Sequence, residues 1–178
     1  MVFTGAGIST PSGISDFRGE KEGLWQRYDP MQVASHTALI MTPQLFFDWF
    51  RPLFLSSWNA LPNAAHKGRA KLENAHFVNS VITQNIDGLH QKAGSRVVFE
   101  LHGSALTFSC SSCGSNYPAI DIFDQFTSGN LIPFCVRCGK ILKPNVVLFE
   151  EPLPERTWHS AKMEASKADV MLVIGSSL

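Results

Sequence analysis

The sequence Thr83-Gln84-Asn85-Ile86-Asp87-Gly88-Leu89-His90 directly follows an apolar run, and the two together predict the fold class. Residues 77–82 (FVNSVI) form an apolar stretch of strand length, with β-branched residues and neither Gly nor Pro, which predicts a buried strand. That strand would end on the hydrogen-bonding side chains of Gln84, Asn85 and Asp87. Ligands bind at the carboxyl ends of the strands in an open α/β sheet. The stretch therefore predicts a parallel sheet with a polar crevice at one edge.

A second apolar run, residues 97–101 (VVFEL), ends on His102-Gly103 in the same way. Two neighbouring strands would thus bring an amide, a carboxylate and an imidazole to one crevice. Each of these residues alone is equally well explained as an ordinary cap or turn residue. Taken together, they favour a ligand site.

Helical patterns alternate with the strands. An aromatic stripe follows Thr42-Pro43, an expected helix start, and Pro52 should end or kink that helix. Residues 62–75 and 154–167 predict two further helices, and 170–174 (VMLVI) predicts a buried strand. The expected fold class is α/β, with a Rossmann-like parallel sheet.

Composition bounds the function. The 178 residues suit a single domain, and 44% of them are hydrophobic. The formal net charge is zero with scattered Lys and Arg, which argues against a nucleic-acid or membrane-surface partner. We expect a soluble, cytoplasmic protein whose single domain, residues 1–178, is incomplete at both ends. We expect both ends to be incomplete because residues 1–3 resemble the last part of a strand, and because the 170–174 strand leads into a loop of the crevice.

The Gly5-Ala6-Gly7-Ile8-Ser9 turn follows the first strand and resembles a loop that approaches a pyrophosphate. A full Gly-x-Gly-x-x-Gly motif is not present, because Thr10 holds the last position. A plain tight turn explains it equally well. Asp16-Phe17-Arg18 then places an acid, an aromatic ring and a base on one loop.

All four cysteines lie between His102 and Lys143, as Cys110-x-x-Cys113 and Cys135-x-x-Cys138. Each pair is followed by glycine, and the spacing is typical of a zinc ribbon, although two disulfides or a redox dithiol would also use four cysteines. We expect one zinc ion, which is structural because four thiolates leave no open position. It would hold together an inserted lobe, residues 104–143, with little apolar core of its own.

Seven motifs occur here in the order typical of sirtuins, which are NAD-dependent protein-lysine deacylases. They are GAGIS at 5–9, GISDFR at 13–18, TQNIDGLH at 83–90, HG at 102–103, the four cysteines, KPNVVLF at 143–149 and GSS at 175–177. The chain resembles that family over nearly its whole length. The resemblance implies a Rossmann-type NAD domain, a zinc lobe and a reaction in the cleft between them, with an acyl-lysine protein or peptide as the substrate.

The resemblance also implies roles for single residues. His102 matches the general base that activates a ribose hydroxyl after nicotinamide has left, and His90 is interpreted as structural. Asn85 and Asp87 match the nicotinamide pocket, and Phe17 would cover the reacting carbon. The cofactor-binding residues would be Gly5, Ala6, Gly7, Ser9, Asp16, Phe17, Arg18, Gln84, Asn85, Ile86, Asp87, Gly175, Ser176 and Ser177. Val146, Val147 and Phe149 match the acyl-lysine channel and the peptide-binding strand.

At three places this sequence bears on how its site would differ from that of other sirtuins. Sirtuins usually have Pro at the place of Ser15, and its absence should loosen the cofactor loop. They usually have Gly at the place of Glu150, so this carboxylate should weaken the grip on substrate or select basic flanking residues. Sirtuins that prefer acidic acyl groups carry a Tyr and an Arg where Phe50 and Leu53 stand here, so neutral acyl groups are expected.

Other functions stay open on the sequence alone. A nicotinamide dehydrogenase would need the full glycine motif. An NAD-dependent protein ADP-ribosyltransferase would use the same scaffold, and a catalytically weak fragment would act as a binding module. We also expect that a chain ending at Leu178 binds NAD poorly and that a longer one recovers activity.

Overall fold

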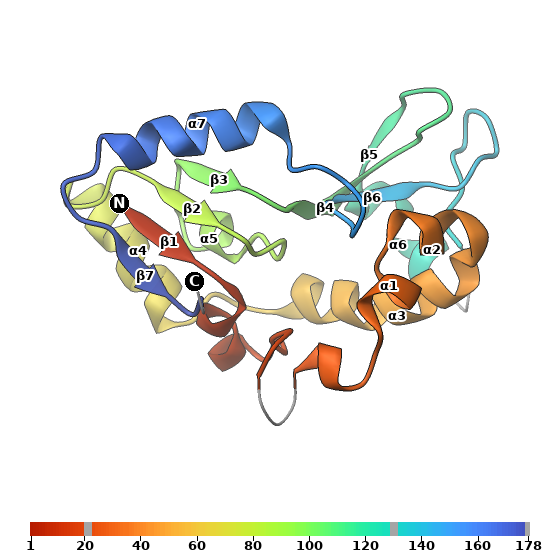
Figure 1. Cartoon of the computed structure of the whole chain (residues 1–178), viewed down its shortest axis with the longest axis horizontal. Coiled ribbons are helices and arrows are strands. Elements are labelled where there is room, and N and C mark those ends of the chain that lie inside the picture. The colour runs from red at the N-terminus through yellow and green to blue at the C-terminus, as the bar shows by residue number, and fades with distance from the viewer. Residues whose placement is uncertain (20–22, 129–131, 177–178) are drawn as a thin grey trace.

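The computed structural model of the protein describes residues 1–19, 23–128 and 132–176. Its larger part is a four-stranded parallel sheet with strand order β3-β2-β1-β7 (Figure 1). The strands are β1 (Val2–Thr4), β2 (Val81–Thr83), β3 (Val98–Glu100) and β7 (Leu172–Ile174). This confirms the predicted Rossmann-like sheet, in which all four strands end at the same edge.

The two faces of this sheet follow from the alternation of side chains along each strand. On one face Phe3, Ile82 and Phe99 pack with Ala161 of helix α7 (Glu155–Ser166). On the other face the buried cluster holds Val2 and Val81. Helices α4 (Ala64–Asn74) and α5 (Leu89–Lys92) lie on that second side of the sheet. The sheet is therefore covered by helices on both faces.

A smaller antiparallel sheet, of strand order β5-β4-β6, lies at the other end of the molecule (Figure 1). It consists of β4 (Gly103–Ser109), β5 (Asn116–Pro118) and β6 (Lys143–Val146), with helix α6 (Ala119–Thr127) after β5. Helices α1 (Pro30–Val33), α2 (His36–Met41) and α3 (Pro43–Asn59) pack beside it. Because β4 begins directly after β3, the two sheets meet at His102.

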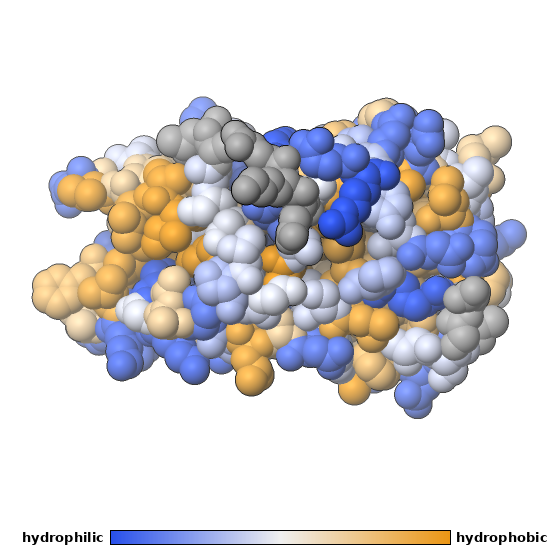
Figure 2. All heavy atoms as spheres, turned by 90° about the horizontal axis from the view of Figure 1, so that it is seen from below, coloured by the Kyte–Doolittle hydropathy of each residue, from blue (hydrophilic) through white to orange (hydrophobic). Residues whose placement is uncertain are grey.

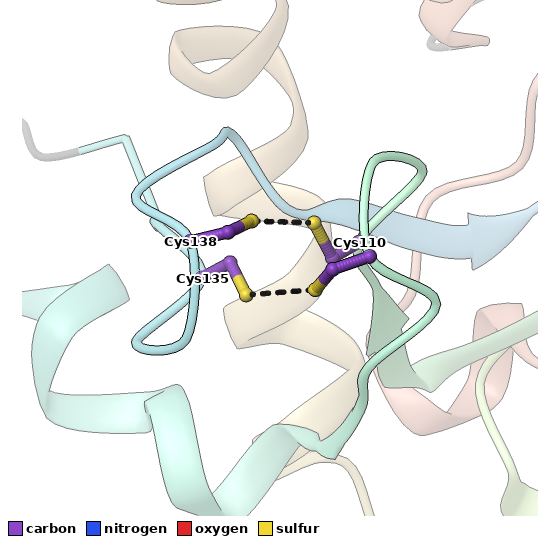
Figure 3. Close-up of side chains that lie close together, drawn as sticks. Cys110, Cys135 and Cys138 are labelled. Carbon is purple, nitrogen blue, oxygen red and sulfur yellow. Dashed lines mark hydrogen bonds between the residues drawn. The ribbon is translucent and has the colours of Figure 1, made fainter.

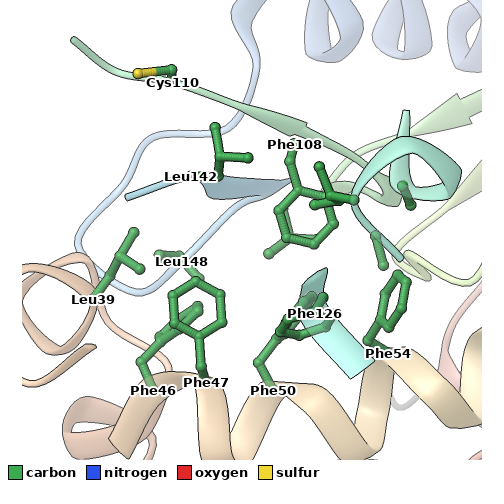
Figure 4. Packing of buried hydrophobic residues seen from close by; sticks show 14 of the residues in the cluster. Leu39, Phe46, Phe47, Phe50, Phe54, Phe108, Cys110, Phe126, Leu142 and Leu148 are labelled. Carbon is green, nitrogen blue, oxygen red and sulfur yellow. The ribbon is translucent and has the colours of Figure 1, made fainter. Parts of the chain in front are cut away.

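The largest apolar core lies between α3 and the small sheet, not within the parallel sheet (Figure 4). Phe50 and Phe54 of α3 pack against Phe108 of β4 and Phe126 of α6. Each of these four rings is at most 1% exposed. The apolar residues of the cysteine-bearing lobe are therefore buried in a core that they share with α3.

Helix α3 differs from its prediction in two respects. It runs through Pro52 to Asn59, although Pro52 removes one backbone donor. The continuation of α3 beyond Pro52 is stabilised because it buries Phe54 on the same face of the helix as Phe50. Thr42 precedes the helix as expected, but its hydroxyl donates to the Ala38 carbonyl oxygen (3.2 Å) instead of capping α3.

Two predicted strands also differ from those observed. The 77–82 run begins with Phe77, which is 80% exposed, and pairing starts only at Val81. The 170–174 run was expected to be buried, but Val170 and Leu172 are exposed because β7 stands at the edge of the sheet order. Apolar residues accordingly gather at this end on the face seen in Figure 2. Within the described residues, no helix is long and apolar enough to cross a membrane.

Candidate active site

The crevice forms where the parallel strands end. Beyond β1, the Gly5 N–H donates to the Ile174 carbonyl oxygen of β7 (3.1 Å), and the Gln84 N–H after β2 donates to the Thr4 carbonyl oxygen (2.9 Å). The loops that follow these strands therefore start side by side. The ligand site was predicted from the sequence to lie at this edge of the sheet.

Two glycine loops pack directly on each other at this edge. The Gly7 N–H donates to the Gly175 carbonyl oxygen (2.9 Å), and a Cβ on Gly7 would lie 2.8 Å from the Gly175 Cα. Gly175 has a φ of 66°, in the left-handed region. Close contact between the loops thus explains the glycines at both positions. Short 3-10 turns, Ala6–Ile8 and Thr10–Ser12, follow β1 in place of a long helix.

A buried polar network links the first glycine loop to the 83–90 motif. Nδ2 of Asn85 donates to the Gly5 carbonyl oxygen (3.2 Å) and to the Ser9 hydroxyl (3.1 Å). The Ser9 hydroxyl in turn donates to Oδ2 of Asp87 (2.7 Å), whose Oδ1 accepts from the Leu89 N–H (2.9 Å). Ser9, Asn85 and Asp87 are each at most 8% exposed. The predicted amide and carboxylate do come together, but Asp87 is already engaged on both oxygens.

His102 lies next to this network, at the junction of the two sheets. Its Nδ1 atom is 2.9 Å from the Gln84 carbonyl oxygen. Burial lowers the pKa of His102 below its usual 6.5, the hydrogen bond to Gln84 opposes that change, and the Arg18 charge adds to it. The imidazole is therefore neutral at neutral pH, which suits a general base.

The segment expected to bind the substrate is tied to His102 and to the helical region. The Val147 N–H donates to the His102 carbonyl oxygen (2.8 Å), and Phe149 pairs with Ser35 as an isolated bridge. Val146 is 6% exposed and belongs to the apolar core, whereas Val147 is half-buried and Phe149 is 41% exposed. Of the three predicted substrate residues, Val147 and Phe149 are thus the ones with accessible side chains.

Glu150 stands directly after this segment with a φ of 76°, a left-handed conformation that suits the glycine expected there. Its Oε2 accepts from the Thr37 N–H in the first turn of α2 (2.9 Å). That hydrogen bond lowers the pKa of the Glu150 carboxyl. The carboxylate therefore binds the protein's own backbone, which gives it a local role that the sequence did not predict.

An aromatic cluster, Phe17, Trp25, Trp49 and Phe149, connects the loop after the first glycine motif to the rest of the site. Trp25 lies 5.2 Å from Phe17, 5.8 Å from Trp49 in a stacked arrangement and 5.8 Å from Phe149 edge-on, all between ring centroids. Trp25 was not predicted to be a site residue from the sequence. The Trp25 N–H donates to the Phe17 carbonyl oxygen (3.1 Å), so the backbones of these two residues lie side by side.

The four cysteine sulfurs all lie within 4.8 Å of one another, and none forms a disulfide. The distance is 3.4 Å from Cys110 Sγ to Cys138 Sγ and 3.6 Å from Cys113 Sγ to Cys135 Sγ (Figure 3). Tetrahedral zinc with Zn–S bonds of about 2.3 Å requires sulfurs roughly 3.8 Å apart. The cluster therefore fits one zinc ion with four thiolate ligands.

The hydroxyls around the sulfurs favour thiolates as well. The Tyr117 hydroxyl lies 3.1 Å from Cys135 Sγ and lowers the pKa of that thiol to about 6. The Ser115 hydroxyl, 3.2 Å from Cys113 Sγ, lowers the pKa of Cys113. The residues around Cys113 and Cys135 thus favour the deprotonated sulfur that a metal binds, whereas the neighbouring thiols raise the pKa of Cys138.

Most predicted site residues lie on the loops of this edge. Asp16 accepts from the Gly19 N–H (2.8 Å), which holds the loop that carries Phe17 and Arg18. Ile86 accepts from the Ala105 N–H of β4 (2.9 Å). Ala6 begins the first 3-10 turn and Ser176 follows Gly175, whereas Ser177 lies outside the described residues.

Comparison with known proteins agrees with this geometry. The sequence pattern described as "Sir2 family" matches residues 5–178. The chain belongs to the Sir2 family, the sirtuins. It is 46% identical to NAD-dependent protein deacylase 2 of Pyrobaculum aerophilum, over 99% of this chain and 69% of that protein. It is 49% identical to NAD-dependent protein deacylase 2 of Archaeoglobus fulgidus, over 100% of this chain and 70% of that one.

Solved Sir2 structures share the fold. A Sir2 homologue in complex with NAD has a TM-score of 0.88 at 39% identity, over 99% of this chain and 67% of that one. A Sir2 variant with a deacetylated peptide and 3′-O-acetyl ADP-ribose has a TM-score of 0.91 at 39% identity, over 99% of this chain and 70% of that one. The sirtuin fold, with a Rossmann-like sheet and a small zinc-ribbon lobe, is therefore established for this protein.

Proposed function

We propose that the protein is an NAD-dependent protein-lysine deacylase, which transfers the acyl group to ADP-ribose and releases nicotinamide. The observation that carries this proposal is the placement of His102 between the Gln84 end of the crevice and the Val147 segment. The relatives named above are themselves NAD-dependent protein deacylases. A substrate on one side and a cofactor on the other would both be within reach of this imidazole.

His102 is the proposed general base. A carbonyl oxygen only accepts hydrogen bonds, so the contact with Gln84 fixes the proton of the neutral ring on Nδ1. The Nε2 lone pair is then available to take a proton from a ribose hydroxyl. When bound, NAD supplies the ribosyl group that accepts the acyl oxygen.

Asn85 is the proposed contact for the nicotinamide carboxamide. Both Nδ2 protons are used inside the protein, by Gly5 and Ser9. The amide oxygen, Oδ1, is therefore the group that Asn85 can offer to a ligand, and it is an acceptor that matches an amide N–H. Asp87 supports this arrangement by holding the Ser9 hydroxyl (2.7 Å). We propose the remaining predicted cofactor residues as the other contacts of NAD.

Phe17 is proposed to cover the reacting carbon and to exclude water from it. Its contact with Trp25 holds the ring on the same side as Phe149 (5.8 Å from Trp25). The acyl chain of the substrate would pass along this aromatic cluster. The peptide backbone would pair beside β6, which is an edge strand of the small sheet.

The cysteine site is proposed to hold one structural zinc ion in the lobe of residues 104–143, within a single catalytic domain of residues 1–178. Four thiolates close the coordination shell, so the metal would stabilise the fold and take no part in the reaction. Free thiols and thiolate-bound zinc persist in a reducing compartment, which supports a cytoplasmic location.

One assay tests the proposal against its alternatives. The protein is incubated with NAD and an acetyl-lysine peptide, and the products are identified by mass spectrometry. A deacylase yields nicotinamide, acetyl-ADP-ribose and free lysine. A protein ADP-ribosyltransferase would instead add ADP-ribose to the peptide, and a binding module would form none of these products. Either of those outcomes contradicts the proposal.

A further inference from the structure

A second histidine, His90, ends a chain of buried hydrogen bonds behind the crevice. His90 Nε2 lies 2.9 Å from the Thr4 hydroxyl, which donates to the Thr83 hydroxyl (2.8 Å). The Thr83 hydroxyl accepts from the backbone N–H of Asn85 (3.0 Å). The four residues are between 0% and 8% exposed. Thr4 and Thr83 are register partners at the ends of β1 and β2, so the chain crosses the sheet where the crevice begins.

The direction of each hydrogen bond follows from the number of protons. Thr4 has one hydroxyl proton, and it points to Thr83. The contact between Thr4 and His90 therefore needs a proton on the histidine, and Nε2 must donate. Burial, with smaller effects from His66 and Arg69, lowers the pKa of His90 to about 3. The ring is accordingly neutral, with its single proton on Nε2.

This chain ends on a residue of the proposed nicotinamide pocket. The backbone of Asn85 is held by Thr83, and its side chain is held by Gly5 and Ser9. Loss of the Thr4 hydroxyl would break its hydrogen bonds with His90 and with Thr83. Thr83 would then be free to rotate away from Asn85. The position of the Asn85 amide oxygen thus depends on side chains that are themselves at most 2% exposed, those of Thr4, Thr83 and His90.

We propose that His90 is a positioning residue for the nicotinamide end of the crevice, which acts on Asn85 through the two threonine hydroxyls. The inference rests on the proposed function, because it assigns the pocket beside Asn85 to nicotinamide. It predicts that the chain matters for ligands that carry nicotinamide and not for those without it. The relevant probes are therefore NAD and ADP-ribose, which differ by that ring.

The first experiment compares Thr4→Val with Thr4→Ser by calorimetry with each ligand. Valine has nearly the shape of threonine but has no hydroxyl, whereas serine retains the hydroxyl. We expect Thr4→Val to weaken NAD binding about tenfold, as the loss of a buried hydrogen bond does, with ADP-ribose binding changed less than about twofold. Thr4→Ser should restore NAD binding. Thr127→Val, which removes a threonine hydroxyl from α6 in the zinc lobe, is the matched control.

Equal losses for NAD and ADP-ribose in Thr4→Val would show general damage to the crevice and would overturn the inference. Unchanged binding of both ligands would overturn it as well. Failure of the unaltered protein to bind NAD at all would contradict the proposed function itself, and with it the assigned role. The two failures are therefore distinguishable.

The second experiment observes the hydrogen-bond chain without any ligand. Long-range proton–nitrogen NMR spectra distinguish the two neutral tautomers of histidine, and His90→Gln identifies the signal. We expect the Nε2–H tautomer of His90, unchanged between about pH 5 and pH 8. In Thr4→Val its nitrogen shifts should move, and in Thr127→Val they should not. A proton on Nδ1, or titration within that range, would overturn the inference.

Discussion

His102 and Gln84 are joined by a hydrogen bond of 2.9 Å between the imidazole Nδ1 and a backbone carbonyl oxygen. Gln84 directly follows β2 and its own N–H is held by the Thr4 carbonyl oxygen (2.9 Å), so its carbonyl group fixes the ring plane of His102 as well as the tautomer. The Val147 N–H holds the backbone of the same histidine from the other side (2.8 Å). The base is therefore set in place before any ligand arrives, by groups from both sheets.

His102→Ala should leave fold and zinc content intact while deacylation falls. Loss of a general base typically lowers the rate by about 10²–10⁴-fold. The measurement is the rate of acetyl-peptide turnover, with the melting temperature and the zinc content as controls. His159→Ala, which removes an exposed histidine from α7, should retain full activity. Near-normal turnover by His102→Ala would assign the role to another group.

The pH dependence of the rate should follow His102. Burial lowers the pKa of this imidazole below 6.5, so its neutral, proton-accepting form persists to a lower pH than for a free histidine. The rate should therefore rise with pH through a pKa below 6.5 and be level at neutral pH. The Arg18 charge contributes to the lowered pKa of His102, so Arg18→Gln should move the rising part of the pH–rate profile to higher pH. A rising part that stays in place or moves to lower pH in Arg18→Gln would contradict the assignment.

The zinc site should be required for folding. Metal analysis should find about one zinc per chain, and Cys113→Ser should lose both the metal and the soluble protein, because the energy of metal binding is also folding energy. Ser111→Ala, an exposed position between the two cysteines of the first pair, should change neither. Protein without zinc, or with Cys110 and Cys113 joined as a disulfide in the native state, would contradict this.

The crevice was predictable because its signals are local. A strand followed at once by polar side chains, repeated at Asn85 and at His102, needs only the parallel connection of β2 and β3 to bring those groups together. The cysteine knuckles are equally local, since Gly114 and Gly139 each donate a backbone hydrogen bond to the first cysteine of their pair (2.9 and 2.8 Å).

The rest depended on tertiary contacts. Trp25, Trp49 and Phe149 lie far apart in the sequence, and nothing in their own neighbourhoods shows that their rings meet. The continuation of α3 through Pro52 has the same cause: of the two predicted effects of Pro52, an end or a kink, the buried face of the helix overrides the end. The role of Glu150 required knowledge that Thr37, in the first turn of α2, lies nearby.

Neutral acyl groups should be preferred over succinyl. Phe50 is 1% exposed and packs on Phe108, so it offers a ligand no polar group. The four rings of the aromatic cluster around Trp25 are uncharged as well. A succinyl carboxylate against these rings would lose its hydration without a partner, so acetyl removal should exceed succinyl removal by more than about tenfold. Rates on matched peptides test this, and equal rates would contradict it.

Glu150 should stabilise the fold through its carboxylate and strain it through its backbone. The φ of Glu150 is 76°, which is unfavourable for a residue with a side chain. The Glu150→Ala variant keeps that conformation and loses the hydrogen bond to Thr37. Glu150→Gly loses the same bond but relieves the conformation. The melting temperature of the alanine variant should therefore lie below those of both the glycine variant and the unaltered protein. Lys162→Ala, at an exposed position in the middle of α7, is the control.

The pH dependence of this effect has a definite sign. The hydrogen bond from Thr37 lowers the pKa of Glu150 below its usual 4.5, so the folded state favours the charged carboxylate. Its stabilising contribution is therefore present above the unfolded pKa and is lost as pH falls through the lower, folded pKa. The gap in melting temperature between the unaltered protein and Glu150→Ala should shrink from neutral pH to about pH 3. A gap that is independent of pH would show that the carboxylate contributes nothing at this position.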